Sequence, residues 1–244
     1  MTNVVESPFP PDQSSTSNVP ILQVENFTKH FGAVKANTNV SLDVLPGEVH
    51  ALVGENGAGK STLLKMIYGV YTPDSGNMFV DGTEVTAGSP AESKALGIGM
   101  VFQDLRLVPA LSVSENMALS LETGPVLRLN ALAKRISAAS AEYGLAVDPK
   151  VLVQHLSIGE RQRAEILKVL MTGARLVILD EPTSVLAPQE VQALFAVVAT
   201  LRAQGFGILI VTHKLGEVRQ IADRVTVLRG GELILGGVDP KDYP

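Results

Sequence analysis

The chain has 244 residues, 45% of them apolar, and a formal net charge of −5 at pH 7. This length allows one large domain or two small ones, and the negative charge argues against a nucleic-acid-binding protein, which usually has a basic face. No apolar run reaches the roughly 18 residues that span a bilayer, and the absence of cysteine excludes disulfides and thiolate metal sites.

The first 19 residues differ from the rest of the chain. They are rich in Ser, Pro and Thr and contain neither Lys nor Arg nor an apolar segment. A secretory signal peptide needs both a basic and an apolar region. We therefore predict a disordered tail over residues 1–19, a cytosolic protein, and a folded domain over residues 20–238.

Short strand patterns dominate the chain from residue 20 to about residue 53, and further strand segments follow up to residue 102. The segment 49–53 is almost entirely apolar, as expected for a central strand of a covered parallel sheet, and it precedes a helix that ends near Gly69. Asp81-Gly82 is a turn signal inside a predicted hairpin. The predicted strand and hairpin segments are residues 21–27, 40–45, 49–53, 77–85 and 97–102.

Residues 104–158 change character and predict a mostly helical subdomain inserted into the sheet. Ser112 and Glu115 have the spacing of a capping box, in which each side chain accepts the other residue's backbone N–H. Asn130 is a candidate N-cap for a helix that stops at Gly144.

Strand patterns return after this block. Residues 176–180 and 207–212 are continuous apolar runs, and the segment 224–235 predicts a hairpin through Gly230-Gly231. Between the two runs one helix carries a single apolar stripe. The stripe consists of Val191, Leu194, Phe195, Val198 and Leu201. Strands that alternate with helices indicate an α/β fold with a parallel sheet.

The sequence GENGAGKST, residues 54–62, matches the phosphate-loop pattern G-x-x-x-x-G-K-[ST] between a predicted strand and a predicted helix. Backbone N–H groups and the helix dipole attract phosphate at such a loop. Lys60 is expected to pair with the β- and γ-phosphates, and the Ser61 hydroxyl to ligate Mg²⁺. The other loop residues expected to contact the nucleotide are Gly54, Asn56, Gly57, Ala58, Gly59 and Thr62. The alternative is a glycine-rich turn that only begins a helix.

Asp180 and Glu181 follow the apolar run at 176–179. The strand is expected to place Asp180 at its carboxyl end near the phosphate loop, where it can hold Mg²⁺ through water. Neighbouring side chains of an extended segment point in different directions, so Glu181 can face the attacking water and serve as general base. The alternative is an ordinary acidic pair at a strand end.

His213 and Gln103 also follow predicted strands. Parallel strands end at one edge of the sheet, so His213 could donate a hydrogen bond there, either to the γ-phosphate or to the backbone of Glu181. The amide of Gln103 could contact Mg²⁺ or the attacking water. Taken alone, a histidine after a strand is usually structural.

The sequence LSIGERQR, residues 156–163, begins a helix. Ser157 can cap this helix, and Glu160 can reach back to the N–H of the cap. The same stretch places a serine and Gly159 at the positive end of the helix dipole, where an anion can bind. A simple cap and half of an anion site both fit these residues.

Together these motifs resemble the nucleotide-binding subunit of an ATP-binding cassette transporter. Their order is the phosphate loop, Gln103, LSIGE at 156–160, Asp180-Glu181 and His213. The resemblance covers residues 20–236 and implies a P-loop NTPase core with a parallel sheet, an N-terminal antiparallel β subdomain and an inserted helical subdomain. It implies ATP and Mg²⁺ as cofactors, and an ATPase that powers transport from the cytoplasmic face of the cell membrane.

The resemblance also implies partners. Two cassettes would pack head to tail around two ATP molecules, so Ser157 and Gly159 of one would contact the γ-phosphate held by the other. Phe31 would stack on adenine, the alternative being a core residue of a short strand. Residues 105–111 would contact a membrane permease subunit. An extracytoplasmic substrate-binding protein is a further expected partner, whereas nucleic acid is not.

Within the family, GENGAGKSTLLKMIYGVYTPDSG and LDEPTSVLAPQE look most like importers of sugars, especially of the nucleoside type. Such importers commonly carry two cassettes in one chain, and this sequence shows one. We therefore expect the first half of such a protein or a single-cassette relative. The abrupt end at DPKDYP favours a fragment.

Two residues depart from the family pattern. Ile158 stands where the first glycine of the signature is usual, and Ala187 stands where many members have Asp in the loop that faces the other cassette. Ala187 precedes Pro188, a good first helical residue, so we expect an N-cap without a capping side chain, at a cost of about 1 kcal/mol. An asymmetric pair of sites, with a different cassette as partner, is the resulting hypothesis.

Two alternatives share the ATP-site residues. One is a soluble cassette ATPase that acts on ribosomes or DNA, although such proteins usually bring basic arms or long coiled insertions. The other is an ATP-binding half with little activity of its own. The presence of Lys60, Glu181 and His213 argues against this second alternative.

Overall fold

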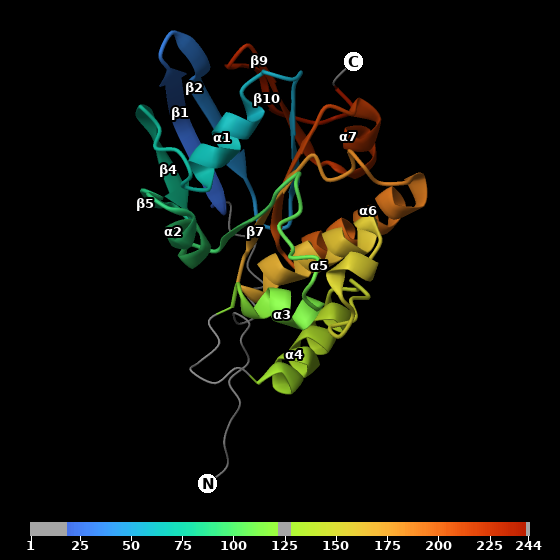
Figure 1. Ribbon diagram of the computed structural model, residues 1–244. Coiled ribbons are helices and arrows are strands. Elements are labelled where there is room, and N and C mark those ends of the chain that lie inside the picture. The colour runs from blue at the N-terminus through green and yellow to red at the C-terminus, as the bar shows by residue number, and fades with distance from the viewer. Residues whose placement is uncertain (1–18, 122–127, 243–244) are drawn as a thin grey trace.

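The computed structural model describes residues 19–121 and 128–242. The tail predicted over residues 1–19 therefore lies outside the described residues, apart from its last position. The strands form two sheets, which Figure 1 shows beside each other above a group of helices. None of the described helices is both long and apolar enough to cross a bilayer.

The first sheet is antiparallel and has the strand order β2-β1-β4-β5. Its strands are β1 (Leu22–Phe31), β2 (Val34–Val44), β4 (Ser75–Val80) and β5 (Thr83–Val85). The hairpin between β4 and β5 turns at Asp81 and Gly82, whose φ angles are 50° and 75°. Positive φ at both central residues is the geometry of the type I′ turn that Asp-Gly favours, so the predicted hairpin is confirmed.

The second sheet has the order β10-β9-β3-β8-β7-β6, and all its pairs are parallel except β9 with β10. Its strands are β3 (Val49–Val53), β6 (Ile98–Val101), β7 (Leu176–Asp180), β8 (Gly207–Thr212), β9 (Arg224–Arg229) and β10 (Glu232–Val238). The predicted α/β fold with a parallel sheet is confirmed, as is the terminal hairpin through Gly230 and Gly231.

The central strands β3, β7 and β8 are almost entirely apolar because both faces of their sheet are covered. In β7, Ile178 packs into the cluster that faces the antiparallel sheet and α1, whereas Val177 and Leu179 pack into the cluster that contains α5 and α6. In β8, Leu209 packs into the first of these clusters and Ile210 packs into the second. Alternate residues of one strand therefore enter two different cores, which explains the continuous apolar runs.

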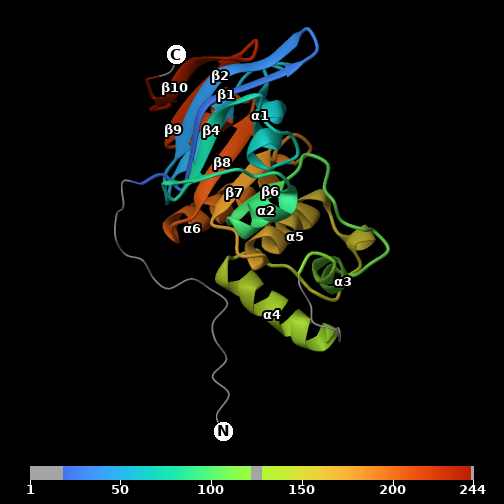
Figure 2. The same ribbon diagram turned by 90° about the vertical axis from the view of Figure 1, so that its left-hand side faces the viewer.

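The helices lie on both sides of this sheet, and Figures 1 and 2 agree that α3 and α4 lie together below the strands. They are α1 (Lys60–Ile67), α2 (Pro90–Ala95), α3 (Val113–Ala118), α4 (Leu129–Glu142), α5 (Ile158–Met171), α6 (Pro188–Ala203) and α7 (Leu215–Ile221), with a 3₁₀ turn at Val153–His155.

The helix ends test the capping predictions. Ser112 and Glu115 form the expected capping box at the start of α3. Asn130 is wrong as an N-cap, because α4 already begins at Leu129 and Arg128 holds the cap position without a side-chain bond. An asparagine inside the first turn gives the same sequence signal as one that precedes it. The predicted end at Gly144 is confirmed by its φ of 67° directly after the helix.

The short helices α2 and α7 escaped sequence analysis. α2 has a clear start signal, since the Ser89 hydroxyl accepts the N–H of Glu92 and Pro90 is the first helical residue. Both helices have only six or seven residues, too few to show an apolar period. The longer α6 carries its predicted stripe, which is buried except for the half-buried Val191.

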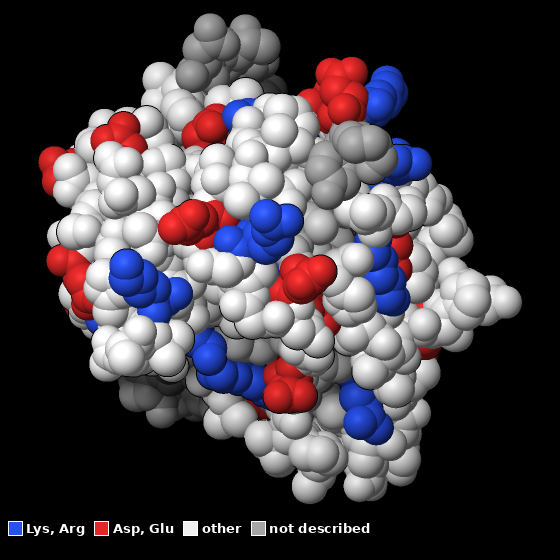
Figure 3. All heavy atoms as spheres, turned by 90° about the horizontal axis from the view of Figure 1, so that it is seen from above, with Lys and Arg blue, Asp and Glu red and all other residues white. Residues whose placement is uncertain are grey.

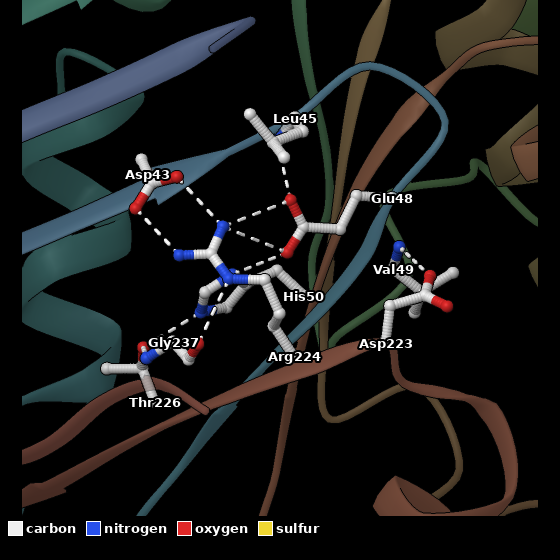
Figure 4. Close-up of polar contacts among 9 residues, drawn as sticks. All are labelled: Asp43, Leu45, Glu48, Val49, His50, Asp223, Arg224, Thr226 and Gly237. Atoms are coloured by element: carbon white, nitrogen blue, oxygen red, sulfur yellow. Dashed lines mark hydrogen bonds and ion pairs between the residues drawn. The ribbon is translucent and has the colours of Figure 1, made fainter. Parts of the chain in front are cut away.

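A polar network joins the two sheets (Figure 4). It lies where β3 and β9 begin, and the phosphate loop follows the other end of β3. Arg224 of β9 donates two hydrogen bonds to Asp43 of β2, at 2.8 and 2.9 Å, and its Nε donates to the Gly237 carbonyl at 3.1 Å. The buried His50 pairs with Glu48 at 3.0 Å. These contacts connect strands that are far apart in sequence.

Candidate functional site

The loop at residues 54–59 joins β3 to α1, and its glycines are required either by packing or by a left-handed backbone. A Cβ added to Gly54 would lie 2.4 Å from the carbonyl oxygen of Leu228. At Gly59 it would lie 2.4 Å from the carbonyl oxygen of Ala36, and φ there is +100°. Gly57 is in open space but has φ +83°. Only glycine satisfies these positions without strain.

Lys60 lies buried inside this loop. Its Nζ donates hydrogen bonds to the carbonyl oxygens of Gly54 at 2.7 Å and Glu55 at 3.0 Å. Ser61 is exposed and Ala58 is buried, so a ligand could reach the hydroxyl of the first but only the backbone around the second. Within the described residues no side chain caps α1, which leaves its first N–H groups for an anion.

The sheet brings the other predicted residues to the edge that holds this loop. Val53 is opposite Thr212, and Asp180 is opposite Val211, so β3, β7 and β8 end together. His213 follows Thr212 directly. Gln103 lies two residues beyond the end of β6, at the same side, and its side chain is exposed. Residues from four strands therefore gather at one sheet edge, as parallel pairing requires.

The pKa of Asp180 depends on its burial and on the charges around it, including that of Lys60. Burial and the adjacent Glu181 raise the pKa of Asp180, and the positive charges of Lys60 and Lys65 oppose this shift. A carboxylate and the Ser61 hydroxyl are oxygen ligands that suit Mg²⁺. In the described part of the chain, no three His, Cys, Asp or Glu side chains group closely enough to hold a metal ion by themselves.

Glu181 follows β7 with a left-handed backbone, φ 45°, and its N–H donates to the Val211 carbonyl at 2.9 Å. The Glu181 Oε1 lies 3.5 Å from the Nδ1 of His213. The Glu181 side chain is 16% exposed and the His213 side chain 48% exposed. The pair can thus present a carboxylate and an imidazole to the same small space at the sheet edge.

Three residues that sequence analysis missed support this turn. The Thr183 hydroxyl donates to Glu217 at 2.6 Å, and Lys214 donates to the Thr183 carbonyl at 2.9 Å. They tie the segment after Glu181 to the segment after His213. The i, i+3 spacing of Lys214 and Glu217 was visible in the sequence, but their distant partner was not.

Phe31 ends β1 and is 43% exposed, so the alternative of an ordinary core residue is wrong. Tyr71, which sequence analysis did not single out, contacts it edge to face with ring centroids 5.2 Å apart. The Lys29 Nζ lies 5.7 Å from the centre of the Phe31 ring. An exposed, supported aromatic face is available for stacking.

Ser157 begins α5 and forms the predicted capping box. Its N–H donates to Glu160 at 2.7 Å, and the N–H of Glu160 donates to the Ser157 hydroxyl at 3.2 Å. Ile158 is 44% exposed. Figure 1 shows α5 among the lower helices and α1 beside the antiparallel sheet. The structure therefore places these residues in a different region from the phosphate loop of the same chain.

Ala187 is the N-cap of α6 and provides no side-chain hydrogen bond, as predicted. The N–H of Ala187 instead donates to the Glu190 carboxylate at 3.1 Å. This is the reciprocal half of a capping box, so only the donor at the third helical position lacks its usual partner.

The segment 105–111 lies beside a groove of about 270 Å³ whose lining includes Phe102, Arg106, Glu165 and Lys168. Arg106 stacks on the Phe102 ring at 3.6 Å. Leu105 and Leu107 pack partly against the helical core, which reduces the apolar surface that this segment offers to a partner.

Residues 37–184 match the family model of the ABC transporter. The chain is 44% identical over 220 residues to the nucleoside import ATP-binding protein NupA of Lactococcus lactis, covering 89% of this chain and 44% of that protein. It is 43% identical to the ribose import ATP-binding protein RbsA 3 of Rubrobacter xylanophilus, covering 88% of this chain and 44% of that protein.

Solved structures agree. A nucleotide-free ATP-binding cassette from an ABC transporter is 29% identical with a TM-score of 0.79, covering 88% of this chain and 90% of that one. CbiO1 of Clostridium perfringens is 30% identical with a TM-score of 0.80, covering 92% and 90%. The chain spans about 44% of the length of the curated relatives described above. It belongs to the ABC transporter family and has the fold of an ATP-binding cassette.

Proposed function

We propose that this chain is the ATP-hydrolysing cassette of a membrane importer for a sugar or nucleoside. The observation that carries the proposal is the convergence of Lys60, Asp180 and the Glu181–His213 pair at one sheet edge. The printed names of the relatives supply the cargo class, since they describe ribose and nucleoside import.

The residues divide the chemistry among them. Bound MgATP supplies the phosphate bond to be broken and a cation that neutralises developing charge. Lys60 would exchange its loop carbonyls for phosphate oxygens, and Ser61 and Asp180 would hold the cation, Asp180 through water. Glu181 orients the attacking water and accepts its proton, and His213 donates a hydrogen bond toward the γ-phosphate. Gln103 contacts the cation or the water.

The remaining predicted contacts complete the nucleotide site. Phe31 stacks on adenine, supported by Tyr71. Ser157 and Gly159 serve the γ-phosphate held by a second cassette, either a head-to-tail partner or a tandem half. This assignment is supported by the position of Ser157 and Gly159 at a helix N-terminus, which attracts anions, and by the separation of that N-terminus from the loop of the same chain.

The membrane partners follow from the proposed role. The groove at Phe102 and Arg106 would receive a helix of the permease, by the helix-in-groove mode of recognition. The chain would then lie at the cytoplasmic face of the membrane as a peripheral subunit. A substrate-binding protein outside the membrane would deliver the cargo, and conformational closure would be the useful product of hydrolysis.

A cassette ATPase acting on ribosomes or DNA is less well supported. Figure 3 shows acidic and basic side chains interspersed over the face seen from above, with neither sign dominating it. Nucleic-acid binding usually depends on a basic stripe or patch. The net charge of −5 points the same way.

Replacement of two residues tests the ATPase proposal. Lys60→Ala should abolish tight MgATP binding, measured by calorimetry, because the buried ammonium is the main charge in the loop. Glu181→Gln should retain binding but lower phosphate release by roughly two to four orders of magnitude. Glu232→Gln, an exposed carboxylate at the start of β10, is the matched control.

Two results would contradict the proposal. If the parent chain neither binds nor hydrolyses MgATP, the ATPase assignment is wrong. If Glu181→Gln hydrolyses ATP as fast as the parent, another group serves as the base.

A further inference from the structure

Glu190, the third residue of α6, reaches out of its own helix to the first turn of α5. Its Oε1 accepts the N–H of Gly159 at 3.1 Å, across 31 residues of sequence. Its Oε2 accepts the N–H of Ala187, also at 3.1 Å. A single carboxylate thus bridges two helix N-termini. The signature residues lie at the start of α5, and the loop at residues 183–187 leads into α6.

This carboxylate is an anion bound at the α5 N-terminus. Hydrogen bonds from the N–H groups of Ala187 and Gly159 and from the Ser157 side chain hold the pKa of Glu190 below its ordinary value, and the charge of Arg163 acts in the same direction. Glu190 is therefore charged at neutral pH. A carboxylate on the N–H groups of a helix start is the arrangement by which helix N-termini bind phosphate.

The residues next to Gly159 leave its backbone N–H available to an anion from outside α5, which in this structure is the Glu190 carboxylate. Ser157 and Glu160 satisfy each other in their capping box, so they do not occupy the Gly159 N–H. A Cβ on Gly159 would lie 2.5 Å from Glu190 Oε1, so a larger residue at this position would push the carboxylate out of its present place. The Ile158 side chain is 44% exposed.

We propose that the Glu190 carboxylate is an internal occupant of the signature's phosphate site, which a γ-phosphate held by the facing cassette must displace. This rests on the proposed function, in which Ser157 and Gly159 meet that phosphate. One N–H cannot serve two anions fully, and two anions brought together repel each other. Displacement of Oε1 breaks the hydrogen bond between Glu190 of α6 and the first turn of α5, while Oε2 keeps its bond to Ala187. Glu190 is thus a positioning residue whose contact opposes ATP-driven closure.

Light scattering tests the competition in the Glu181→Gln background, which should trap a closed dimer on MgATP. Adding Glu190→Gln keeps the size of the side chain but removes its charge. We expect half of the chains to dimerise at a roughly tenfold lower MgATP concentration, because the like-charge repulsion is gone. Gln189→Ala, an exposed neighbour on the same helix, is the control and should leave this concentration unchanged.

Amide exchange of Gly159 tests the contact without any dimer. In the nucleotide-free chain, Glu190→Ala should speed exchange at Gly159 by roughly tenfold or more, since a protecting acceptor is lost. Unchanged exchange, or an unchanged or higher MgATP requirement for Glu190→Gln, overturns the proposal. So does a chain that binds MgATP but stays monomeric both with and without Glu190→Gln. Failure of the parent to bind MgATP would instead count against the proposed function.

Discussion

Burial and the adjacent Glu181 raise the pKa of Asp180, whereas Lys60 and Lys65 act in the opposite direction. An acid whose pKa is raised by folding gives its full contribution to stability below its unfolded pKa, which is about 4. That contribution is lost as pH rises through the folded pKa. At neutral pH the ionised Asp180 therefore costs stability, and a bound cation would offset this cost.

Replacing Asp180 by Asn removes the buried charge. We expect the melting temperature of the ligand-free chain at pH 7 to rise by about 2–4 °C, and the further rise on adding MgATP to shrink. At pH 4 the gain over the parent should diminish, because the parent carboxyl is then protonated. Differential scanning fluorimetry at both pH values measures this.

Asp74→Asn is the control for this prediction. A hydrogen bond from Lys29 lowers the pKa of Asp74, so removing its charge should not stabilise the chain. An Asp180→Asn chain that melts below the parent without ligand would show that the carboxylate is structurally favourable.

At the scale of elements, the helices α5 and α6 differ at the N-cap position, where α5 has a serine and α6 has an alanine. Ser157 is the N-cap of α5 and takes part in both halves of a capping box. Ala187 is the N-cap of α6, where only the half that Glu190 supplies is formed. Both helices are long enough for their first turns to matter to the fold. The comparison isolates the energetic effect of one hydroxyl.

Exchange of the two caps should change stability in opposite directions. Ser157→Ala should lower the free energy of unfolding by about 1 kcal/mol, and Ala187→Ser should raise it by up to about 1 kcal/mol. Urea unfolding followed by circular dichroism measures both. If Ala187→Ser leaves the unfolding midpoint unchanged, the missing cap has no energetic consequence in α6.

At the scale of the whole molecule, the contact between Arg224 and Asp43 forms a joint between the two sheets. Arg224 binds Asp43 with both terminal nitrogens, and the two residues belong to different sheets, 181 residues apart in sequence (Figure 4). The hydrogen bond from Arg224 is the largest cause that lowers the pKa of Asp43. This joint lies at the amino ends of the central strands and can keep the antiparallel sheet in place behind the nucleotide site.

Asp43→Asn should lower the free energy of unfolding at pH 7 by about 1 kcal/mol, a value reduced by the partial exposure of the pair. An acid with a lowered pKa stabilises above its unfolded pKa and loses that effect as pH falls through the folded value. The difference between variant and parent should therefore disappear toward pH 3. Urea unfolding at pH 7 and pH 3 tests this.

The control is Asp81→Asn, which removes a more exposed ion pair to Arg175 in a turn that accepts Asn. It should change stability little at either pH. Equal losses for the two variants at pH 7 would mean that the joint between the sheets has no special strength.

Much of the fold was predictable because the apolar patterns are local. The segments 49–53, 176–180 and 207–212 coincide with β3, β7 and β8, since strands covered on both faces consist almost entirely of apolar residues. Asn130 was misplaced because a helix start depends on where its first turn packs, and a capping residue type also fits one turn inside.

By itself the sequence determined the phosphate loop, since Lys60, Ser61 and the glycines act within nine adjacent residues whose spacing suffices. It also determined that Asp180, Glu181 and His213 end buried strands. Only the tertiary structure decided that Glu190 reaches Gly159 and that Arg224 reaches Asp43. A hydrogen bond depends on the distance between two atoms in space, and no local pattern encodes which distant residue will supply the partner.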